Sequence, residues 1–365
     1  MTAPLPQPDP AVASAPDGAP PAAPSSPGAA RRGLPFWANP RLGLFAVIAI
    51  LVVVFSALRP SFLNVDLTLV PMQADLSVFA VVGLAQLCVL SLGHMNLAVP
   101  RMAALSAFAM GWSYQHWDLP LWPGLLIGLA VGAAVGAAAG WIIVATGASS
   151  FVVTLALDFA LVGLVSLLYS HVGDGVAFNV HPAGMDSLRT DTFSDYCTGN
   201  VCGPPVPLIV PIALVAVLVT GLLFRASRVG REMLMTGSNL KAAQLSGIPT
   251  ARRVVQAHAL SGLLSGLAGF LLAVNSGAFS ADVGNTFLLP SFLSPVLGGT
   301  LLSGGAVSVL GTVLGAGLTE VIRTGLNLLD FSLQALNIYI GLVLVAALSL
   351  DRVRHVIAER RGSRP

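Results

Sequence analysis

The sequence predicts an all-α protein, a polytopic membrane helical bundle of about ten transmembrane helices with broken or re-entrant segments. Three observations lead to this prediction. The 365-residue chain is 55% hydrophobic and only 9% charged, whereas a soluble domain normally carries about 25% charged residues. Its mean hydropathy is +0.83. Its charged residues gather in a few stretches and leave long uncharged intervals between them. These observations exclude the soluble enzyme classes.

The charge balance and the cysteine count exclude further classes of protein. The chain has 18 Lys and Arg against 16 Asp and Glu, so its charge gives no indication of a nucleic-acid partner. Three cysteines are too few for a disulfide scaffold, and their spacing matches no metal site. Transporters, channels, receptors and membrane-embedded enzymes remain.

The N-terminal segment 1–40 is predicted to be a disordered cytoplasmic tail. Its first 30 residues contain nine Pro and nine Ala and almost no large apolar side chain, so it cannot bury enough surface to offset its ordering entropy. Arg31, Arg32 and Arg41 precede the apolar interval 42–58. We interpret this interval as a retained first span rather than a signal peptide.

Uncharged intervals locate the spans, because a charge at the bilayer centre costs roughly 3 kcal/mol. A helix needs about 20 residues to cross, so the two longest intervals must fold back on themselves. We divide them at 146–150 and 298–305, where small polar residues and glycines interrupt the apolar sequence. The predicted spans are 42–58, 68–91, 97–115, 121–145, 151–170, 207–224, 254–275, 287–301, 306–323 and 337–350.

The basic residues predict the orientation. Segments 1–41, 225–253 and 351–365 hold 14 of the 18 Lys and Arg, and ten spans place all three on one side, which the positive-inside rule assigns to the cytoplasm. Segment 171–206, with one Arg and four Asp, is then external. The expected organisation is a transmembrane domain at 41–350 and a basic cytoplasmic tail at 351–365.

The external segment contains Cys197 and Cys202, which can close a small disulfide loop in an oxidising compartment. The alternative is two unpaired small residues. Cys88 lies within a span and is expected to be a packing residue.

Glycines recur every four residues in the fourth predicted span, which places them on one helix face and allows another helix to approach closely. This pattern predicts packing within the chain, with a dimer interface as the alternative. The residues are Gly124, Gly128, Gly132, Gly136 and Gly140.

Four ionisable residues lie within predicted spans, where such groups usually face the bundle interior or a cavity. They are Asp75, Asp158, Glu320 and Arg323. Glu320 and Arg323 are three residues apart, so we expect them to form an ion pair on one helix face. Asp158 has no cation near it in sequence. It is either a polar contact for a hydroxylated solute or a buried, hydrogen-bonded acid.

The basic segment 225–253 contains a predicted short helix from about Asn239 to Ser246, ended by Gly247 and Pro249. A short helix held between two spans can transmit movement from a soluble partner into the membrane. An ordinary solvated connector is the alternative.

This segment resembles the coupling loop of permease subunits of ATP-binding-cassette (ABC) importers of the ribose, xylose and simple-sugar class, and the resemblance extends over about 42–350. It is carried by the Thr-Gly-Ser-Asn-Leu-Lys-Ala-Ala-Gln-Leu-Ser-Gly-Ile run at 236–248, by the glycine-rich stretches 261–269 and 296–305, and by 323–329 and 151–156. It implies contact with an ATPase through Gly237, Asn239, Lys241, Ala242, Ala243, Leu245, Ser246 and Gly247.

The resemblance also implies function and partners. The chain is expected to be a transport subunit and not an enzyme, in the bacterial inner membrane, moving a monosaccharide or polyol as a homodimer with a periplasmic solute-binding protein. The chain has no GxxxxGK[ST] sequence, so a separate ATPase subunit would use ATP and Mg. No cofactor is expected in this chain.

One segment departs from the family pattern. Family members commonly carry Asp-Leu-Ser-Val-Gly in the early broken span, and this chain has Asn96 at the Asp position and Pro100 at the Gly position. Because broken helices at membrane depth must face protein or a water-filled cavity, we take His94, Asn96 and Asp158 as candidate solute-pathway residues. The alternative is a helix end at the cytosolic interface with Arg101 reaching toward water.

Two other functions remain open at this point. A secondary transporter would use the intramembrane acids to couple an ion gradient. An ABC permease for branched-chain amino acids would share the architecture by family resemblance. The sequence does not name the solute, and a membrane enzyme is the least favoured class because no nucleophile and base arrangement lies in or beside the spans.

Overall fold

The computed structural model describes residues 40–172, 177–196, 205–285, 287–331, 338 and 341–342, and these residues are almost entirely helical. The predicted all-α membrane bundle is therefore confirmed. The helices are α1 (Pro40–Leu58), α2 (Val70–Leu90), α3 (Val99–Trp117), α4 (Leu121–Thr146), α5 (Ser150–His171), α6 (Met185–Thr190), α7 (Val210–Ala226), α8 (Arg228–Ser238), α9 (Leu240–Leu245), α10 (Thr250–Ser276), α11 (Leu288–Leu297) and α12 (Val309–Leu328).

The expected number of ten spans is not confirmed. Five helical stretches among the described residues are long and apolar enough to cross a membrane, and there would be six if α7 and α8, which are bent by 70° relative to each other, formed one span. The helices α1 and α11 are apolar but shorter, and the predicted span 337–350 lies almost wholly outside the described residues. The predicted tails also lie outside them, apart from the first residue of α1.

The predicted breaks in the long apolar intervals are present. Gly147, with a φ of +67°, ends α4 just before α5 begins. Residues 298–308 separate α11 from α12, and this turn contains three glycines with positive φ, Gly299, Gly304 and Gly305. A left-handed backbone of this kind favours glycine because a Cβ would clash with the following carbonyl.

Helix α2 runs through the centre of the bundle, and its residues from Ser77 to Leu90 are all buried. Helix α10 packs on α2, α3 and α4. A Cβ at Gly132 or Gly136 would lie 2.3 and 2.1 Å from the carbonyl oxygens of Gly262 and His258 on α10. The glycine face of α4 is therefore a packing surface within the chain, as the spacing predicted.

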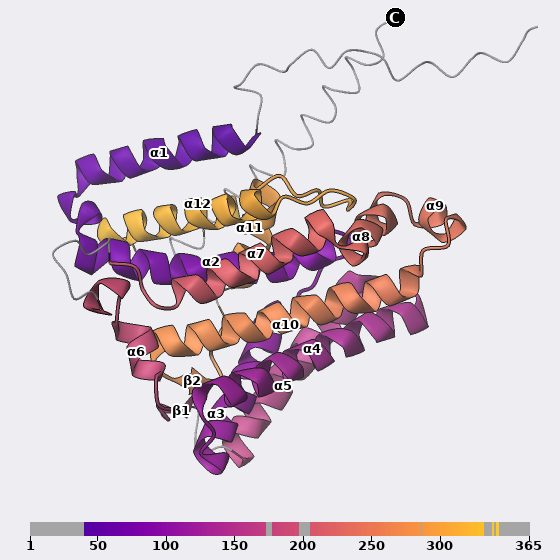
Figure 1. Ribbon diagram of the computed structural model, residues 1–365, viewed down its shortest axis with the longest axis horizontal. Coiled ribbons are helices and arrows are strands. Elements are labelled where there is room, and N and C mark those ends of the chain that lie inside the picture. Colours follow the sequence, from indigo (N-terminus) through magenta and orange to yellow (C-terminus); the bar gives the residue numbers. More distant parts are fainter. Residues whose placement is uncertain are drawn as a thin grey trace, which may run out of the picture.

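Two short strands join the N-terminal and C-terminal halves of the chain. Strand β1 (Ala177–Phe178) pairs antiparallel with β2 (Phe279–Ser280), with Phe178 opposite Phe279. Figure 1 shows α8 and α9 at one end of the bundle and α6 near the opposite end. This separation agrees with the expectation that segments 225–253 and 171–206 lie on different sides of the membrane.

Candidate functional site

The short helix predicted in the basic segment is α9, and its ends match the sequence signals. Asn239 caps it, since its Oδ1 accepts a hydrogen bond of 3.0 Å from the Ala242 backbone N–H. Gly247 follows with a φ of +74°. Helix α9 is the part of the segment that lies farthest from the bundle in Figure 1.

The exposed side of α9 carries two leucines beside the polar Lys241 and Gln244. Leu245 is 90% exposed and Leu240 is 52% exposed, whereas Ala243 is only 4% exposed. The side chain of Ala243 therefore faces the bundle, and its contact with a partner stays a prediction. The other seven residues, Gly237, Asn239, Lys241, Ala242, Leu245, Ser246 and Gly247, keep some exposed surface.

Helix α8 was not predicted, because the basic segment gave no apolar repeat long enough to indicate it. An ion-pair cluster holds it against the start of α10. Glu232 accepts 2.6 Å and 2.7 Å hydrogen bonds from the Nε atoms of Arg228 and Arg253, and the Glu232 and Arg253 side chains are about one-tenth exposed. Gln256 in turn accepts a hydrogen bond from Arg253.

The guanidinium groups of Arg228 and Arg253, which donate hydrogen bonds to Glu232, hold the pKa of its carboxyl below the ordinary value. The folded state therefore gains stability from this charged form at neutral pH. That gain is lost only as the pH falls through the lowered pKa.

The end of α8 meets two other breaks in the chain at a glycine junction, which consists of Gly93, Gly237, Gly304 and Gly305. A Cβ at Gly237 would lie 2.1 Å from the Ser91 carbonyl oxygen and 2.7 Å from the Gly305 nitrogen. A Cβ at Gly304 would lie 2.5 Å from the Gly93 nitrogen, and the Gly305 N–H donates a 3.0 Å hydrogen bond to the Ser91 carbonyl. The end of α8, just before α9, is thus in main-chain contact with the segment between α2 and α3 and with the segment between α11 and α12.

Asn96 does not line an open pathway in this structure. Its side chain is fully buried, donates a 3.0 Å hydrogen bond to Ser261 Oγ and accepts one of 3.0 Å from the Ala98 N–H. The break between α2 and α3 faces protein, because Ser150 and Thr154 on α5 accept hydrogen bonds from its backbone N–H groups. Every polar group of the Asn96 side chain has a partner inside the chain in this structure, and its place on a solute pathway stays a prediction.

His94 is half-buried beside α10. Its Nδ1 lies 3.3 Å from the Nε2 of His258, so one imidazole donates a hydrogen bond to the other. This contact joins the break between α2 and α3 to the N-terminal half of α10.

Asp158 has a cation partner that its sequence neighbours did not reveal. Its Oδ1 lies 3.8 Å from the Nε of Arg101 at the start of α3, and both side chains are about one-fifth exposed. Arg101 also donates a hydrogen bond to Asn285, whose side chain donates one of 2.8 Å to Asp282. We call Arg101, Asp158, Asp282 and Asn285 the polar cluster.

The polar cluster lies at the packed side of α5, where Asp158 shares a face with the buried Thr154, Leu161 and Val165, and next to a face that is apolar and exposed. On that helix Phe159 is 69% exposed and Val152 is 59% exposed. Charged groups in hydrocarbon are costly, so a partly exposed charged pair at the edge of such a face is expected to meet water or another protein surface. The cluster is therefore the candidate solute contact that the described residues support best.

Glu320 and Arg323 do not form the predicted ion pair. The Oε1 of Glu320 accepts a 2.9 Å hydrogen bond from Thr324, four residues on along the same face, and the Arg323 guanidinium carbon lies 5.3 Å from the centre of the Phe79 ring on α2. The packing of α12 on α2 therefore determines what the Arg323 side chain contacts, and the three-residue spacing to Glu320 does not. Asp75 accepts a 2.7 Å hydrogen bond from Asn275.

The structure describes one of the three cysteines. Cys197 and Cys202 lie outside the described residues, so the disulfide remains a prediction. Cys88 is buried as a free thiol in α2. Among the residues that the structure describes, no group of three or more His, Cys, Asp or Glu side chains is placed to hold a metal ion.

The apolar helical bundle and the family match together identify a multi-pass membrane permease. The chain belongs to the family described as the permease component of the branched-chain amino acid transport system, which matches residues 70–348. It is a transport subunit of the ABC-importer permease class that includes sugar-type importers, as the sequence predicted.

Two relatives of this chain carry the same name. The autoinducer 2 import system permease protein LsrD of Salmonella paratyphi A is 29% identical over 321 residues, which cover 87% of this chain and 94% of the relative. LsrD of Shigella flexneri is 29% identical over 330 residues, covering 89% and 97%. No solved structure matches the chain.

Proposed function

We propose that this permease moves a small polar solute, a monosaccharide or polyol, into the cytoplasm, and that the polar cluster contacts the solute on its way. The observation that carries this proposal is the Arg101–Asp158 pair, which is partly exposed beside the apolar outer face of α5. Hydroxyl groups can accept hydrogen bonds from a guanidinium and donate them to a carboxylate. The names of the relatives, which import autoinducer 2, support a small solute.

In this proposal a homodimer encloses the pathway, with the polar clusters of the two copies facing it. Two ATPase subunits, which hold ATP and Mg, bind the α9 helices, and a periplasmic solute-binding protein docks at the α6 end. Purified chain in vesicles is expected to transport only when the ATPase is present, with no effect of an uncoupler. Uptake by the chain alone, abolished by an uncoupler, would establish the secondary transporter instead.

The proposed orientation in the inner membrane places both termini and α9 in the cytoplasm. In a chain whose Cys197 and Cys202 are replaced by serine, Ser187→Cys is expected to react with an impermeant thiol reagent on intact cells. Ser246→Cys, exposed on α9, is expected to react only after the cells are opened. Labelling of Ser246→Cys from outside would reverse the topology.

Asp158→Asn is expected to slow uptake at least about tenfold, because a hydrogen bond to a charged group contributes about 1.5 to 3 kcal/mol and about 1.4 kcal/mol corresponds to a factor of ten. Initial uptake rates in vesicles measure the effect. The matched control is Asp330→Asn, which removes the exposed ion pair with Arg59 on another face and should leave uptake unchanged.

A reversed pair separates solute contact from structural support. The double variant Arg101→Asp with Asp158→Arg keeps an ion pair between α3 and α5 but exchanges the positions of donor and acceptor. If the pair contacts solute, uptake stays low in this variant although the protein folds. Restored uptake would make the pair a structural link only.

The family description favours one second candidate, a branched-chain amino acid. The carboxylate of an amino acid could pair with Arg101 and its ammonium group with Asp158. Competition assays distinguish the candidates, since leucine would inhibit uptake in that case, whereas ribose or a polyol would inhibit it in the first.

A further inference from the structure

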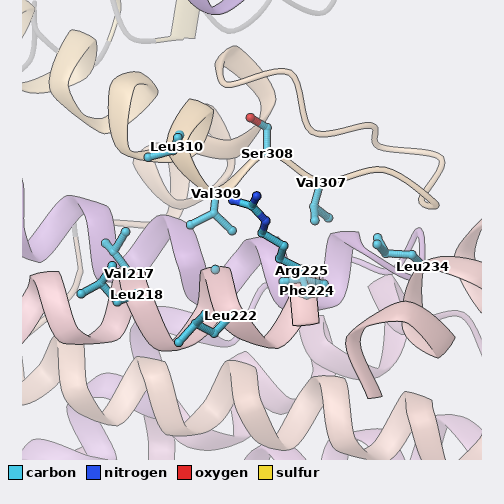
Figure 2. A pocket seen from close by; sticks show the side chains of 11 residues that line it. Val217, Leu218, Leu222, Phe224, Arg225, Leu234, Val307, Ser308, Val309 and Leu310 are labelled. Carbon is cyan, nitrogen blue, oxygen red and sulfur yellow. The ribbon is translucent and has the colours of Figure 1, made fainter. Parts of the chain in front are cut away.

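A groove of about 420 Å³ lies between α7 and the start of α12, close to the end of the molecule that carries α8 and α9 (Figures 1 and 2). Its walls are apolar from Val217 to Leu222 on α7 and from Val307 to Leu310 at the start of α12. Leu218, Leu222 and Leu310 are 56%, 61% and 63% exposed. The groove is open along the side of the bundle.

The groove has a positive mouth. Arg225 lies there, exposed, and has no ion-pair partner or hydrogen bond to another side chain among the residues that the structure describes. Figure 2 shows its side chain extending toward Ser308 and Val309, where the 20-residue helix α12 begins. The N-terminus of a helix carries partial positive charge. The guanidinium of Arg225 and the N-terminus of α12 therefore place positive charge at one end of the apolar groove.

We propose that this groove binds an anionic phospholipid, with its phosphate beside Arg225 and the start of α12 and an acyl chain along α7. The length fits, since the eight steps along the helix from Val217 to Arg225 rise about 12 Å and half of a bilayer's hydrocarbon core is about 15 Å. A free anion would use the mouth but leave the apolar walls uncovered. A phospholipid occupies both, since its phosphate binds at the positive end and its acyl chain covers the apolar walls.

The test compares retained lipid in wild-type and variant permease taken from nanodiscs that contain phosphatidylglycerol and phosphatidylcholine. Arg225→Gln is expected to lower retained phosphatidylglycerol about fivefold, the ratio expected when one basic residue near a charged membrane surface is lost. Arg225→Lys should retain it. The matched control is Arg252→Gln, an exposed arginine at the same end but outside the groove, and it should bind as the wild type does.

A second variant tests the apolar part of the groove. A Cβ at Gly221 would lie 3.9 Å from Val309 Cγ1, so Gly221→Leu projects into the groove without a backbone clash. It is expected to lower retention of phosphatidylglycerol while Arg225 is intact. Equal retention in Arg225→Gln and Arg252→Gln would overturn the proposal, and so would displacement of all bound phosphatidylglycerol by inorganic phosphate.

A different occupant of the groove would also overturn the proposal. If a second copy of the chain covers it, Leu222→Cys is expected to form disulfide-linked dimers above the level seen in the parent chain. Absence of such dimers, together with the loss of phosphatidylglycerol in Arg225→Gln, supports the lipid.

Discussion

Leu245→Asp is expected to abolish ATP-driven uptake while the folded permease stays in the membrane. Leu245 is 90% exposed on α9, so its loss removes little packing within the chain. Covering a leucine with a partner surface contributes about 1.5 to 3 kcal/mol, and an unpaired aspartate buried in the same contact adds a desolvation cost. Binding of the ATPase should therefore weaken by more than about tenfold.

Co-purification of the ATPase and ATP-driven uptake in vesicles measure this effect. The matched control is Phe193→Asp, since Phe193 is 48% exposed in the short helix Phe193–Tyr196, in the predicted external segment. That variant should retain the ATPase in wild-type amount. Full ATPase recovery with Leu245→Asp would show that α9 is only a connector.

Replacing both Gly132 and Gly136 with alanine is expected to prevent α4 from docking on α10. The two added Cβ atoms would lie 2.3 and 2.1 Å from backbone carbonyl oxygens of α10, which no side-chain rotation can relieve. Overpacking costs typically about 1 to 3 kcal/mol at one site, and here the obstacle is main chain at two sites. We expect a large loss of folded protein in the membrane.

The control is the same substitution where space is open. Gly163 lies in α5 with nothing within 4 Å of its Cβ position, so Gly163→Ala should be neutral or slightly stabilising, because alanine favours helix over glycine by about 1 kcal/mol. Thermal unfolding in detergent and membrane yield compare the two. A double variant as stable as Gly163→Ala would mean that the close α4–α10 contact is not required.

The sequence predicted those parts of the fold that depend on local rules. Uncharged intervals located the long apolar helices, although not their number as spans, because burying charge in a bilayer is costly wherever it occurs. The four-residue glycine repeat indicated a close helix contact, and Asn239 and Gly247 marked the ends of α9 because capping acts within one helical turn.

Parts of the site that depend on distant residues could not be predicted in this way. Asp158 pairs with Arg101, which is far from it in sequence, and Glu232 is held by Arg253 from the next helix. Helix spacing alone suggested a Glu320–Arg323 pair, but α2 packs Phe79 beside the arginine and changes its partner. Asn96 was assigned to the solute pathway from the family pattern and the broken helix, and its hydrogen bond to Ser261 becomes visible only in the fold.

The glycine junction has a mechanical consequence. Its contacts join main-chain atoms of residues 91–93, 237–238 and 303–305, with no long side chain between them whose rotamers could absorb a displacement. A connection of this kind has low compliance, since backbone atoms in van der Waals contact cannot approach further. A shift of α9 and α8 by a given distance must therefore displace the ends of α2 and α12 by a comparable distance, rather than being dissipated in side-chain rearrangement.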